Sequence, residues 1–463
     1  RLRGVRSTRL SYRGTNQFLL EFIKSISKFE ALKISVSGIR GIFGKDLTLY
    51  DILKFSNNFS ALIKSKKCVI AKDTRPSSSI IAETAKAGLM QCGIDVYDLG
   101  MSPTPVAFRE SRKYGAGLII TSSHNPIEWN GLKLIIDGKG LNEEQMSLIN
   151  TEQITNKSKI GTEYNIKSDY ADEAAKVIGD VSDSPKVTVD VGGGAAKTVS
   201  PKLLEMIGCD VKTINNDLEK NSRGPDPTTD PLNELISNNE ERDLGFAFDL
   251  DGDRLVIVSN GQKQTPDVTL GLGVAKALEL GYKNFVLSLD TSISIENYIK
   301  QNGGSVFYSK IGESNVIAKM IETKSHAGGE GSSGGFILSD FNYCRDGILT
   351  SGLIASIIKK DIFYHILDFM KKYHQIRDKI EYQSDCHDEL LRIISSKMKE
   401  KFGNLETLDG LKVTIDEDSW VLVRKSNTEN VIRVSVESDN LEKARNILLQ
   451  TKELVKESYE QIK

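Results

Sequence analysis

Short apolar runs separated by helical patterns recur along this chain, and this alternation limits the folds that it can adopt. A helix is expected over residues 79–91, between two of these runs. The runs that predict buried strands lie at 68–71, 95–99, 117–120, 187–191, 245–248 and 285–289. Strands that alternate with helices are typical of mostly parallel sheets covered by helices.

The last part of the chain, from about residue 379, has a different pattern. A terminal helix is expected from Leu441, and alternating runs predict strands at 411–415, 420–423 and 431–436. A length of 463 residues is too great for one ordinary core. We therefore predict an α/β protein with three consecutive mixed-sheet α/β domains and a smaller C-terminal α+β domain, at 31–166, 167–264, 265–375 and 376–463.

The composition is that of an ordinary globular protein, with 39% hydrophobic residues, 27% charged residues and a net charge of −2. This balance gives no reason to expect nucleic acid or a membrane as a partner, and no apolar run approaches the roughly 18 residues that span a bilayer. Five cysteines without paired spacing predict reduced thiols in a cytoplasmic protein. Residues 1–30 are rich in arginine, and we expect them to be an extension, disordered or not native, outside the fold.

Ser123 follows the apolar run 117–120 directly and precedes His124 and Pro126. Ligands of open α/β sheets bind beyond the carboxyl ends of strands, where this serine is expected to lie. Such a serine can carry a phosphoryl group if a neighbour activates it and positive charge offsets the phosphate. The alternative is a turn that only caps the strand. Without the other motifs, the sequence of this loop favours that alternative.

Asp249, Asp251 and Asp253 also follow a predicted buried strand, at 245–248. Three carboxylates this close repel one another unless a cation lies among them. Their hard oxygens suit Mg²⁺. An EF-hand is excluded because the sixth and twelfth positions counted from Asp249 would be Arg254 and Asn260. A solvated acidic turn is the other alternative, and the apolar strand before the aspartates argues against it.

The glycine-dense segment 328–335 is predicted to be a flexible loop, because glycine loses the most entropy inside a regular element. Its polar side chains, Glu330, Ser332 and Ser333, suit the hydroxyl groups of a sugar. A surface loop without function explains the segment equally well.

The segment 424–430 combines an arginine with small polar residues, which is typical of an anion-binding loop. Its candidate phosphate ligands are Arg424, Ser426, Asn427 and Thr428, with Arg433 close by in the sequence. A helix N-cap would explain the serine and threonine but not the arginines. His124 either orients a phosphoryl group or only shapes its loop.

Together these motifs resemble the α-D-phosphohexomutase superfamily, particularly the archaeal-type phosphoglucosamine mutases, phosphomannomutases and phosphoglucomutases. The resemblance runs from about Leu32 to the C-terminus and includes three further segments, at 37–41, 130–133 and 344–347. It implies four domains around a central cleft, each of which supplies one loop.

The resemblance also implies a role for each candidate residue. Ser123 would be the phosphoserine and would share one Mg²⁺ with Asp249, Asp251 and Asp253. The groups beside the transferring phosphate would be Arg40, Lys133, His124 and Arg254, with Lys133 as a general acid or base whose pKa is lowered by cations such as Arg40. Sugar hydroxyl groups would contact Glu330 and Ser332 or Ser333. The other phosphate would be held by Arg424, Ser426, Asn427 and Thr428, with Arg433 in support.

The implied reaction interconverts a hexose or hexosamine 1-phosphate and its 6-phosphate through a sugar 1,6-bisphosphate, which is both intermediate and activator. The expected protein is a cytoplasmic monomer or homodimer that binds a small phosphosugar.

Two alternatives remain open from the sequence. Residues 248–252 resemble the haloacid-dehalogenase signature, in which Asp249 itself would accept the phosphoryl group, but no later acidic pair stands out after Lys310. A non-catalytic sugar-phosphate binder is the second alternative, and the presence of Ser123 beside a complete acidic trio argues against it.

Overall fold

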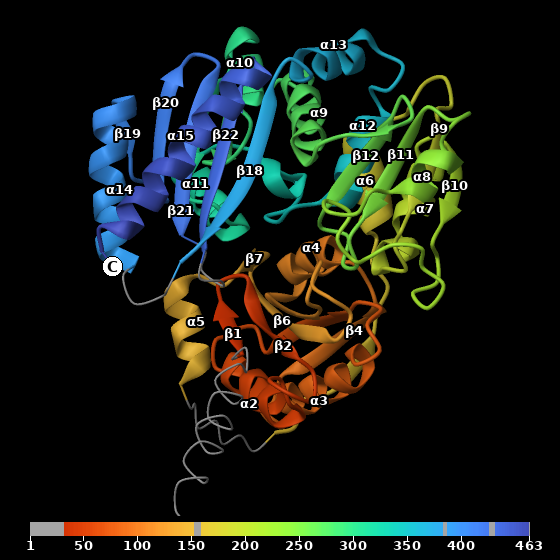
Figure 1. Cartoon of the computed structure of the whole chain (residues 1–463). Coiled ribbons are helices and arrows are strands. Elements are labelled where there is room, and N and C mark those ends of the chain that lie inside the picture. Colours follow the sequence, from red (N-terminus) through yellow and green to blue (C-terminus); the bar gives the residue numbers. More distant parts are fainter. Residues whose placement is uncertain (1–31, 152–158, 383–386, 426–430, 463) are drawn as a thin grey trace, which may run out of the picture.

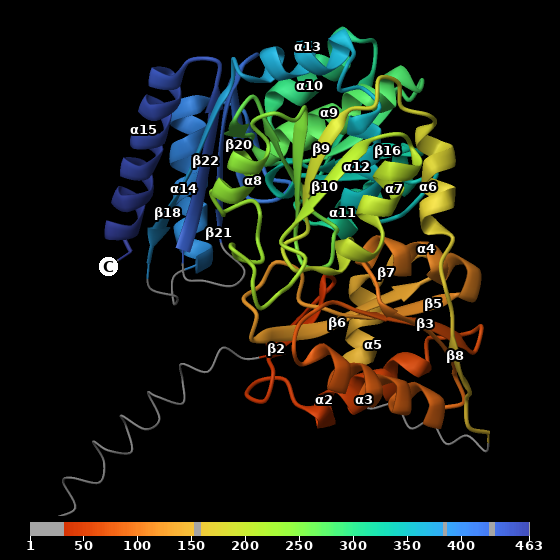
Figure 2. The same ribbon diagram turned by 90° about the vertical axis from the view of Figure 1, so that its right-hand side faces the viewer.

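Four β-sheets follow one another along the chain in the computed structural model, which describes residues 32–151, 159–382, 387–425 and 431–462. We call the parts built on these sheets the first to fourth domains. The first lies below the others in Figure 1, and Figure 2 shows the same arrangement from the side. The predicted architecture of three mixed-sheet α/β domains and a C-terminal α+β domain is confirmed, while the predicted residue boundaries stay predictions.

The first domain has a mixed sheet of eight strands. Its strands are β1 (Lys33–Ser35), β2 (Gly38–Ile42), β3 (Lys67–Lys72), β4 (Asp95–Met101), β5 (Ala116–Ile120), β6 (Trp129–Ile136), β7 (Lys139–Gly140) and β8 (Glu163–Asn165). Its helices are α2 (Leu49–Ser60), α3 (Ser78–Gln91), α4 (Thr104–Tyr114) and α5 (Glu143–Asn150). The order is β1–β2–β6–β5–β3–β4–β8, with β7 on β6. Because β3 pairs in parallel with β5, the carboxyl ends of these two strands are neighbours.

The second domain has three parallel strands and two antiparallel ones, in the order β10–β9–β11–β12–β13. The strands are β9 (Lys186–Asp190), β10 (Asp210–Ile214), β11 (Leu244–Phe248), β12 (Leu255–Ser259) and β13 (Gln262–Lys263). The helices are α6 (Tyr170–Ile178), η1 (Ala195–Thr198), α7 (Ser200–Met206) and α8 (Asn233–Asn238).

The third domain has the sheet order β15–β14–β16–β17, in which the last strand is antiparallel. The strands are β14 (Asn284–Ser288), β15 (Ser305–Ser309), β16 (Ala327–Glu330) and β17 (Gly335–Leu338). The helices are α9 (Pro266–Glu279), α10 (Ile293–Gln301), α11 (Glu313–Thr323), η2 (Gly331–Ser333), α12 (Gly347–Ala355) and α13 (Asp361–Met370).

The fourth domain is an antiparallel sheet in the order β18–β22–β21–β20–β19. The strands are β18 (His374–Glu381), β19 (Leu405–Glu406), β20 (Leu411–Asp416), β21 (Ser419–Lys425) and β22 (Val431–Ser438). Two helices lie side by side on the sheet, α14 (His387–Phe402) and α15 (Leu441–Glu460). The strands and the terminal helix predicted for this part of the chain are confirmed.

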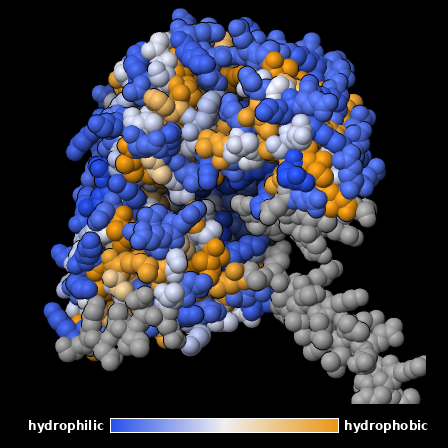
Figure 3. Space-filling view, turned by 90° about the vertical axis from the view of Figure 1, so that its left-hand side faces the viewer, coloured by the Kyte–Doolittle hydropathy of each residue, from blue (hydrophilic) through white to orange (hydrophobic). Residues whose placement is uncertain are grey.

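The second and third domains share one apolar core. It runs without a break from Val189 in β9 and Leu203 in α7 to Leu272 in α9 and Leu353 in α12. The first and fourth domains have separate clusters. The fourth domain meets the third through a small apolar cluster of Leu289, Ile293, Trp420 and Leu422. The molecule is hollowed between its lower and upper parts, and hydrophilic residues line much of the hollow (Figure 3).

No helix in the described ranges is long and apolar enough to cross a bilayer.

The glycine-dense segment is not the flexible loop that the sequence predicts. Gly328 and Gly329 lie inside β16, Gly335 begins β17, and η2 makes a tight connection between these buried strands. A Cβ on Gly328 would lie 2.4 Å from the carbonyl oxygen of Val286, and one on Gly329 would lie 2.1 Å from that of Gly335. The glycines are therefore required by close backbone approach within the sheet, and not by mobility.

Replacing Gly329 by alanine should destabilise the shared core by about 1–3 kcal/mol, because the added methyl group collides with backbone. Denaturant unfolding followed by circular dichroism measures the change as a lower midpoint. Gly224→Ala is the control, since nothing lies within 4 Å of its added Cβ. Equal midpoints for the two variants would contradict the steric explanation.

Candidate active site

Ser123 lies just beyond β5 in a conformation that its own residue type disfavours. Its φ is 51°, in the left-handed region, and its side chain is fully buried. The hydroxyl Oγ donates a hydrogen bond of 2.7 Å to Oδ2 of Asp249 in the second domain. The serine and the first aspartate of the trio therefore meet, as the sequence analysis expected. A backbone held in this region costs on the order of 1 kcal/mol, so neighbouring groups must fix it.

Arg75 fixes the Ser123 loop, although this role was not predicted from the sequence. Its guanidinium donates to the carbonyl oxygens of Ser123 at 2.6 Å, Asn125 at 2.7 Å and Trp129 at 2.9 Å, and also to that of Pro126. The carboxylate of Asp73 holds the other edge of the guanidinium, at 3.1 Å from Nε. A signal was present, because polar residues follow both β3 and β5, which are neighbours in the sheet.

The acidic trio lies beyond β11 and is completely buried. Oxygens of Asp249, Asp251 and Asp253 lie within 4.8 Å of one another. Nζ of Lys133 lies 2.7 Å from Oδ2 of both Asp251 and Asp253, and Nη2 of Arg345 lies 2.9 Å from Oδ2 of Asp253. Oδ1 of Asp251 and Oδ1 of Asp253 are buried without a hydrogen-bond partner among the described residues. Such oxygens fit a hard divalent cation.

Burial and the neighbouring carboxylates control the protonation of this cluster. Burial, and then the charges of Asp251 and Asp253, raise the pKa of Asp249 well above its ordinary range. Burial alone would lower the pKa of Lys133, but the same two carboxylates outweigh it and raise that pKa above its ordinary value. The expectation that the pKa of Lys133 is lowered by neighbouring cations is therefore wrong in this structure. The lysine is an ammonium that offsets part of the negative charge of the trio.

His124 lies between the serine and a cation. Its Nδ1 is 3.3 Å from Oγ of Ser123, and its Nε2 is 3.3 Å from Nη2 of Arg254. Burial, and then the charges of Arg254 and Arg40, lower the pKa of His124 to about 2, so the ring is neutral. Because an arginine can only donate, Nε2 accepts and the proton lies on Nδ1, facing the serine. Arg40 lies close by, with Nη1 at 3.4 Å from Oδ1 of Asn125.

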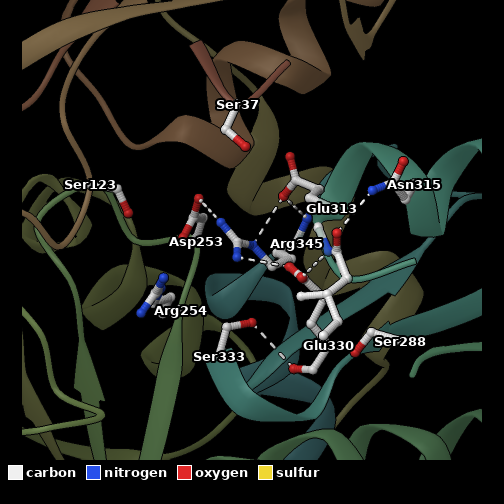
Figure 4. Close-up of polar contacts among 12 residues, drawn as sticks. Ser37, Ser123, Asp253, Arg254, Ser288, Glu313, Asn315, Glu330, Ser333 and Arg345 are labelled. Carbon is white, nitrogen blue, oxygen red and sulfur yellow. Dashed lines mark hydrogen bonds and ion pairs between the residues drawn. The ribbon is translucent and has the colours of Figure 1, made fainter. Parts of the chain in front are cut away.

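The third domain contributes a charged wall built around Arg345 (Figure 4). Its guanidinium contacts Oε2 of Glu330 at 3.0 Å and Oε2 of Glu313 at 3.1 Å, in addition to Asp253. The other oxygen of Glu330 accepts a hydrogen bond of 2.8 Å from the backbone N–H of Gly312. Neither Arg345 nor Glu313 was predicted from the sequence. The only signal was the position of Arg345 in the segment 344–347.

Ser332 and Ser333 lie in different environments at the turn after β16. The hydroxyl of Ser333 donates to the backbone oxygen of Glu330 at 3.2 Å and is buried, whereas Ser332 is half-buried. Of these two hydroxyl groups, only that of Ser332 therefore makes no hydrogen bond within the turn among the described residues.

A cavity of about 550 Å³ lies between the first and third domains. Four predicted catalytic residues line it, namely Arg40, His124, Lys133 and Arg254, together with Ser37 and the charged wall of Glu313, Glu330 and Arg345. Ser123, which is fully buried, lies behind His124 and is not among the lining residues. The site therefore combines cations, a neutral histidine and carboxylates around a space large enough for a small ligand.

The predicted phosphate-binding segment is described only at its edges. Arg424 lies near the end of β21, with Nε 3.0 Å from Oδ1 of Asp409. Arg433 lies opposite Arg424 on β22. The other candidates, Ser426, Asn427 and Thr428, lie outside the described residues.

Comparison with known families covers most of the chain. Profiles described as phosphoglucomutase/phosphomannomutase alpha/beta/alpha domains I, II and III match residues 31–160, 168–262 and 265–373. The profile of the phosphoglucomutase/phosphomannomutase C-terminal domain matches residues 392–454.

Individual proteins agree with these profiles. A probable phosphoglucosamine mutase of Methanosphaera stadtmanae is 34% identical over 92% of this chain and 97% of its own length. A phosphoglucomutase/phosphomannomutase of Thermococcus kodakarensis is 33% identical over 89% of this chain and 95% of its own.

Among solved structures, a phosphoglucomutase/phosphomannomutase family protein from Burkholderia thailandensis has the same fold, with a TM-score of 0.80, 24% identity, and coverage of 92% of this chain and 98% of that one. These similarities do not favour the haloacid-dehalogenase alternative or the silent binder. With four profiles in order and relatives above 30% identity along nearly the whole chain, this protein belongs to the phosphoglucomutase/phosphomannomutase family.

Proposed function

We propose that this protein interconverts the 1-phosphate and 6-phosphate of a hexose or hexosamine, with Ser123 as the residue that carries the phosphoryl group. The observation that carries the proposal is the hydrogen bond of 2.7 Å between Oγ of Ser123 and Asp249, inside a buried acidic trio beside the cavity. A serine positioned in this way has both a carboxyl partner for its hydroxyl group and a place for a cation.

Asp249, Asp251, Asp253 and Ser123 are the residues that would hold Mg²⁺. When bound, the cation would offset negative charge on the phosphoryl group. The two unpartnered oxygens, Oδ1 of Asp251 and Oδ1 of Asp253, are the donors left free for it among the described residues.

The surrounding side chains supply positioning and positive charge, which are the main needs of phosphoryl transfer. In the proposed step the sugar hydroxyl oxygen bonds to phosphorus, the bond to Oγ of Ser123 breaks, and a proton moves from the hydroxyl to the serine. Lys133, held as an ammonium by Asp251 and Asp253, suits the role of acid in this proton exchange. Arg254 and His124 fix the serine side of the site.

The charged wall supports an amino sugar as the preferred substrate. Glu313 gives one carboxylate oxygen to Arg345, and its other oxygen accepts no hydrogen bond from any described residue. Figure 4 shows Glu313 and Ser37 facing each other across the cavity. Two glutamates share one arginine here, and the carboxylate oxygen that Glu313 keeps free among the described residues is an acceptor that suits the amino group of a hexosamine. The phosphoglucosamine mutase names of several relatives support the same choice.

The finer predictions from the sequence belong to this proposal as well. They are activation by a sugar 1,6-bisphosphate, a monomeric or homodimeric state, and a cytoplasmic location.

Replacing Ser123 by alanine should remove a covalently bound phosphate and reduce turnover by at least about 10³-fold, because the acceptor oxygen is lost. Intact-mass measurement after incubation with sugar bisphosphate, together with a coupled mutase assay, checks both effects. Ser122→Ala is the matched control, since the buried hydroxyl of Ser122 has no hydrogen-bond partner in the described structure. A phosphate that persists in the Ser123 variant would move the acceptor to Asp249.

Removing divalent cations with a chelator should abolish turnover, and added Mg²⁺ should restore it. Mg²⁺ should also raise the unfolding temperature, because it relieves repulsion among three buried carboxylates. Asp253→Asn should weaken this thermal shift. An unchanged unfolding temperature of the wild type across a Mg²⁺ titration would contradict a metal site in the trio.

Replacing Glu313 by glutamine should raise KM for glucosamine 6-phosphate roughly tenfold, because a charged hydrogen bond to the amino group is lost. The KM for glucose 6-phosphate, which has a neutral hydroxyl group instead, should change far less. Steady-state kinetics on both substrates measures the difference. Equal changes in the two KM values would show that Glu313 does not distinguish the amino group from a hydroxyl group.

A further inference from the structure

One carboxylate, Asp409, joins the fourth domain to the third. It lies in the connection between β19 and β20 and is partly buried, with 18% of its side chain exposed. Its Oδ1 lies 3.0 Å from Nε of Arg424 in its own domain. Its Oδ2 accepts a hydrogen bond of 2.8 Å from the backbone N–H of Ile311 in the third domain. A single side chain therefore contacts a candidate phosphate ligand and a neighbouring domain at once.

The contact with Arg424 determines which of its nitrogens remain for a ligand. A guanidinium has five N–H groups in a fixed plane. Asp409 takes the one on Nε, while neither terminal nitrogen has a hydrogen-bond partner among the described residues. The two terminal nitrogens are free to form parallel hydrogen bonds to two phosphate oxygens. Asp409 thus fixes the Nε side of Arg424 and leaves the edge with the two terminal nitrogens unoccupied among the described residues.

The contact between Asp409 and Ile311 lies one residue from a contact with the charged wall. The next residue, Gly312, donates its N–H to Oε1 of Glu330 at 2.8 Å. Gly312 has a φ of 119°, which L side chains rarely adopt, so the loop reaches both acceptors only with glycine there. Glu330 then contacts Arg345 at 3.0 Å, and Arg345 contacts Asp253 at 2.9 Å. Hydrogen bonds and ion pairs, joined by the peptide link between Ile311 and Gly312, therefore connect Arg424 to the acidic trio.

The fourth domain has a separate anchor on the third. Glu437, on β22, accepts hydrogen bonds from the backbone N–H of Ile293 at 2.7 Å and from Nε1 of Trp420 at 2.6 Å. Leu289 and Leu422 pack beside this contact. Because these interactions do not involve Asp409, the two domains keep a buried interface when Asp409 is replaced.

We propose that Asp409 is a positioning residue. It orients Arg424 toward the phosphate that is not being transferred, and it links this contact to Glu330 in the charged wall. The proposal rests on the proposed mutase function, in which Arg424 binds this phosphate. Asp409 touches neither substrate nor reacting atoms. It acts through Arg424 and through the Ile311–Gly312 backbone.

The test compares Asp409→Ala and Asp409→Asn with the matched control Asp416→Asn. Asp416 is an acidic residue of the same domain that pairs with Lys443 at the surface. Asp409→Ala should raise KM for glucosamine 6-phosphate, and the Kd measured by calorimetry, by roughly tenfold, with a smaller change in kcat. Asp409→Asn should lie between, because an amide keeps one acceptor oxygen. The control should keep the wild-type KM and Kd.

A merely structural role would give a different result. Partial unfolding lowers the active fraction, so kcat would fall at unchanged KM together with the unfolding temperature. In an Arg424→Ala background the guanidinium is absent, so adding Asp409→Ala should raise Kd much less than it does in the wild type. A wild-type KM and Kd in Asp409→Ala, or full additivity of the two substitutions, would overturn the proposal.

Two readouts separate this proposal from the proposed function. If the wild type binds glucosamine 6-phosphate but turns over no hexose phosphate, the mutase function fails while the Kd series still tests Asp409. If the wild type turns over and Asp409→Ala leaves Kd unchanged, only the role of Asp409 fails. Unphosphorylated glucosamine serves as the reference ligand, because its binding should not respond to Asp409.

Discussion

Mutual repulsion among three buried aspartates is the constraint on which the site depends. Fully buried carboxylates this close are tolerated only where positive charge or a metal offsets them. Here the second domain supplies the acids, while Lys133 from the first domain and Arg345 from the third supply cations at 2.7 and 2.9 Å. Assembly of the domains and preparation of the site for phosphate chemistry are therefore one event, since no single domain contains a neutral cluster.

The parts of the site that lie at strand ends were predictable from sequence. An apolar run followed directly by polar residues fixes both the strand and the position of its loop, which is why the regions of Ser123 and Asp249 could be located. What could not be predicted depends on contacts distant in sequence. The pKa of Lys133 follows from Asp251 and Asp253, more than 100 residues away, and Glu313 gains its place only through Arg345. The glycines of β16 were misread because close approach and flexibility have the same sequence signature.

Rigid support lies directly behind the reactive serine. The loop that carries the left-handed Ser123 is held by four backbone contacts of Arg75, one of them to Ser123 itself, and Arg75 is held by Asp73. A guanidinium suits this task because its several donors lie in one plane and cannot lose their protons. The strained serine and its hydrogen bond to Asp249 thus exist before any ligand arrives, and binding energy need not be used to form them.

The core shared by the second and third domains has a consequence for how this architecture can diversify. The apolar side chains of these two domains pack against one another in a single cluster. A recombination event that exchanged one of them alone would join two halves whose side chains had never been fitted together. The first and fourth domains have cores of their own, so an exchange of either one would leave the larger core of the second and third domains intact.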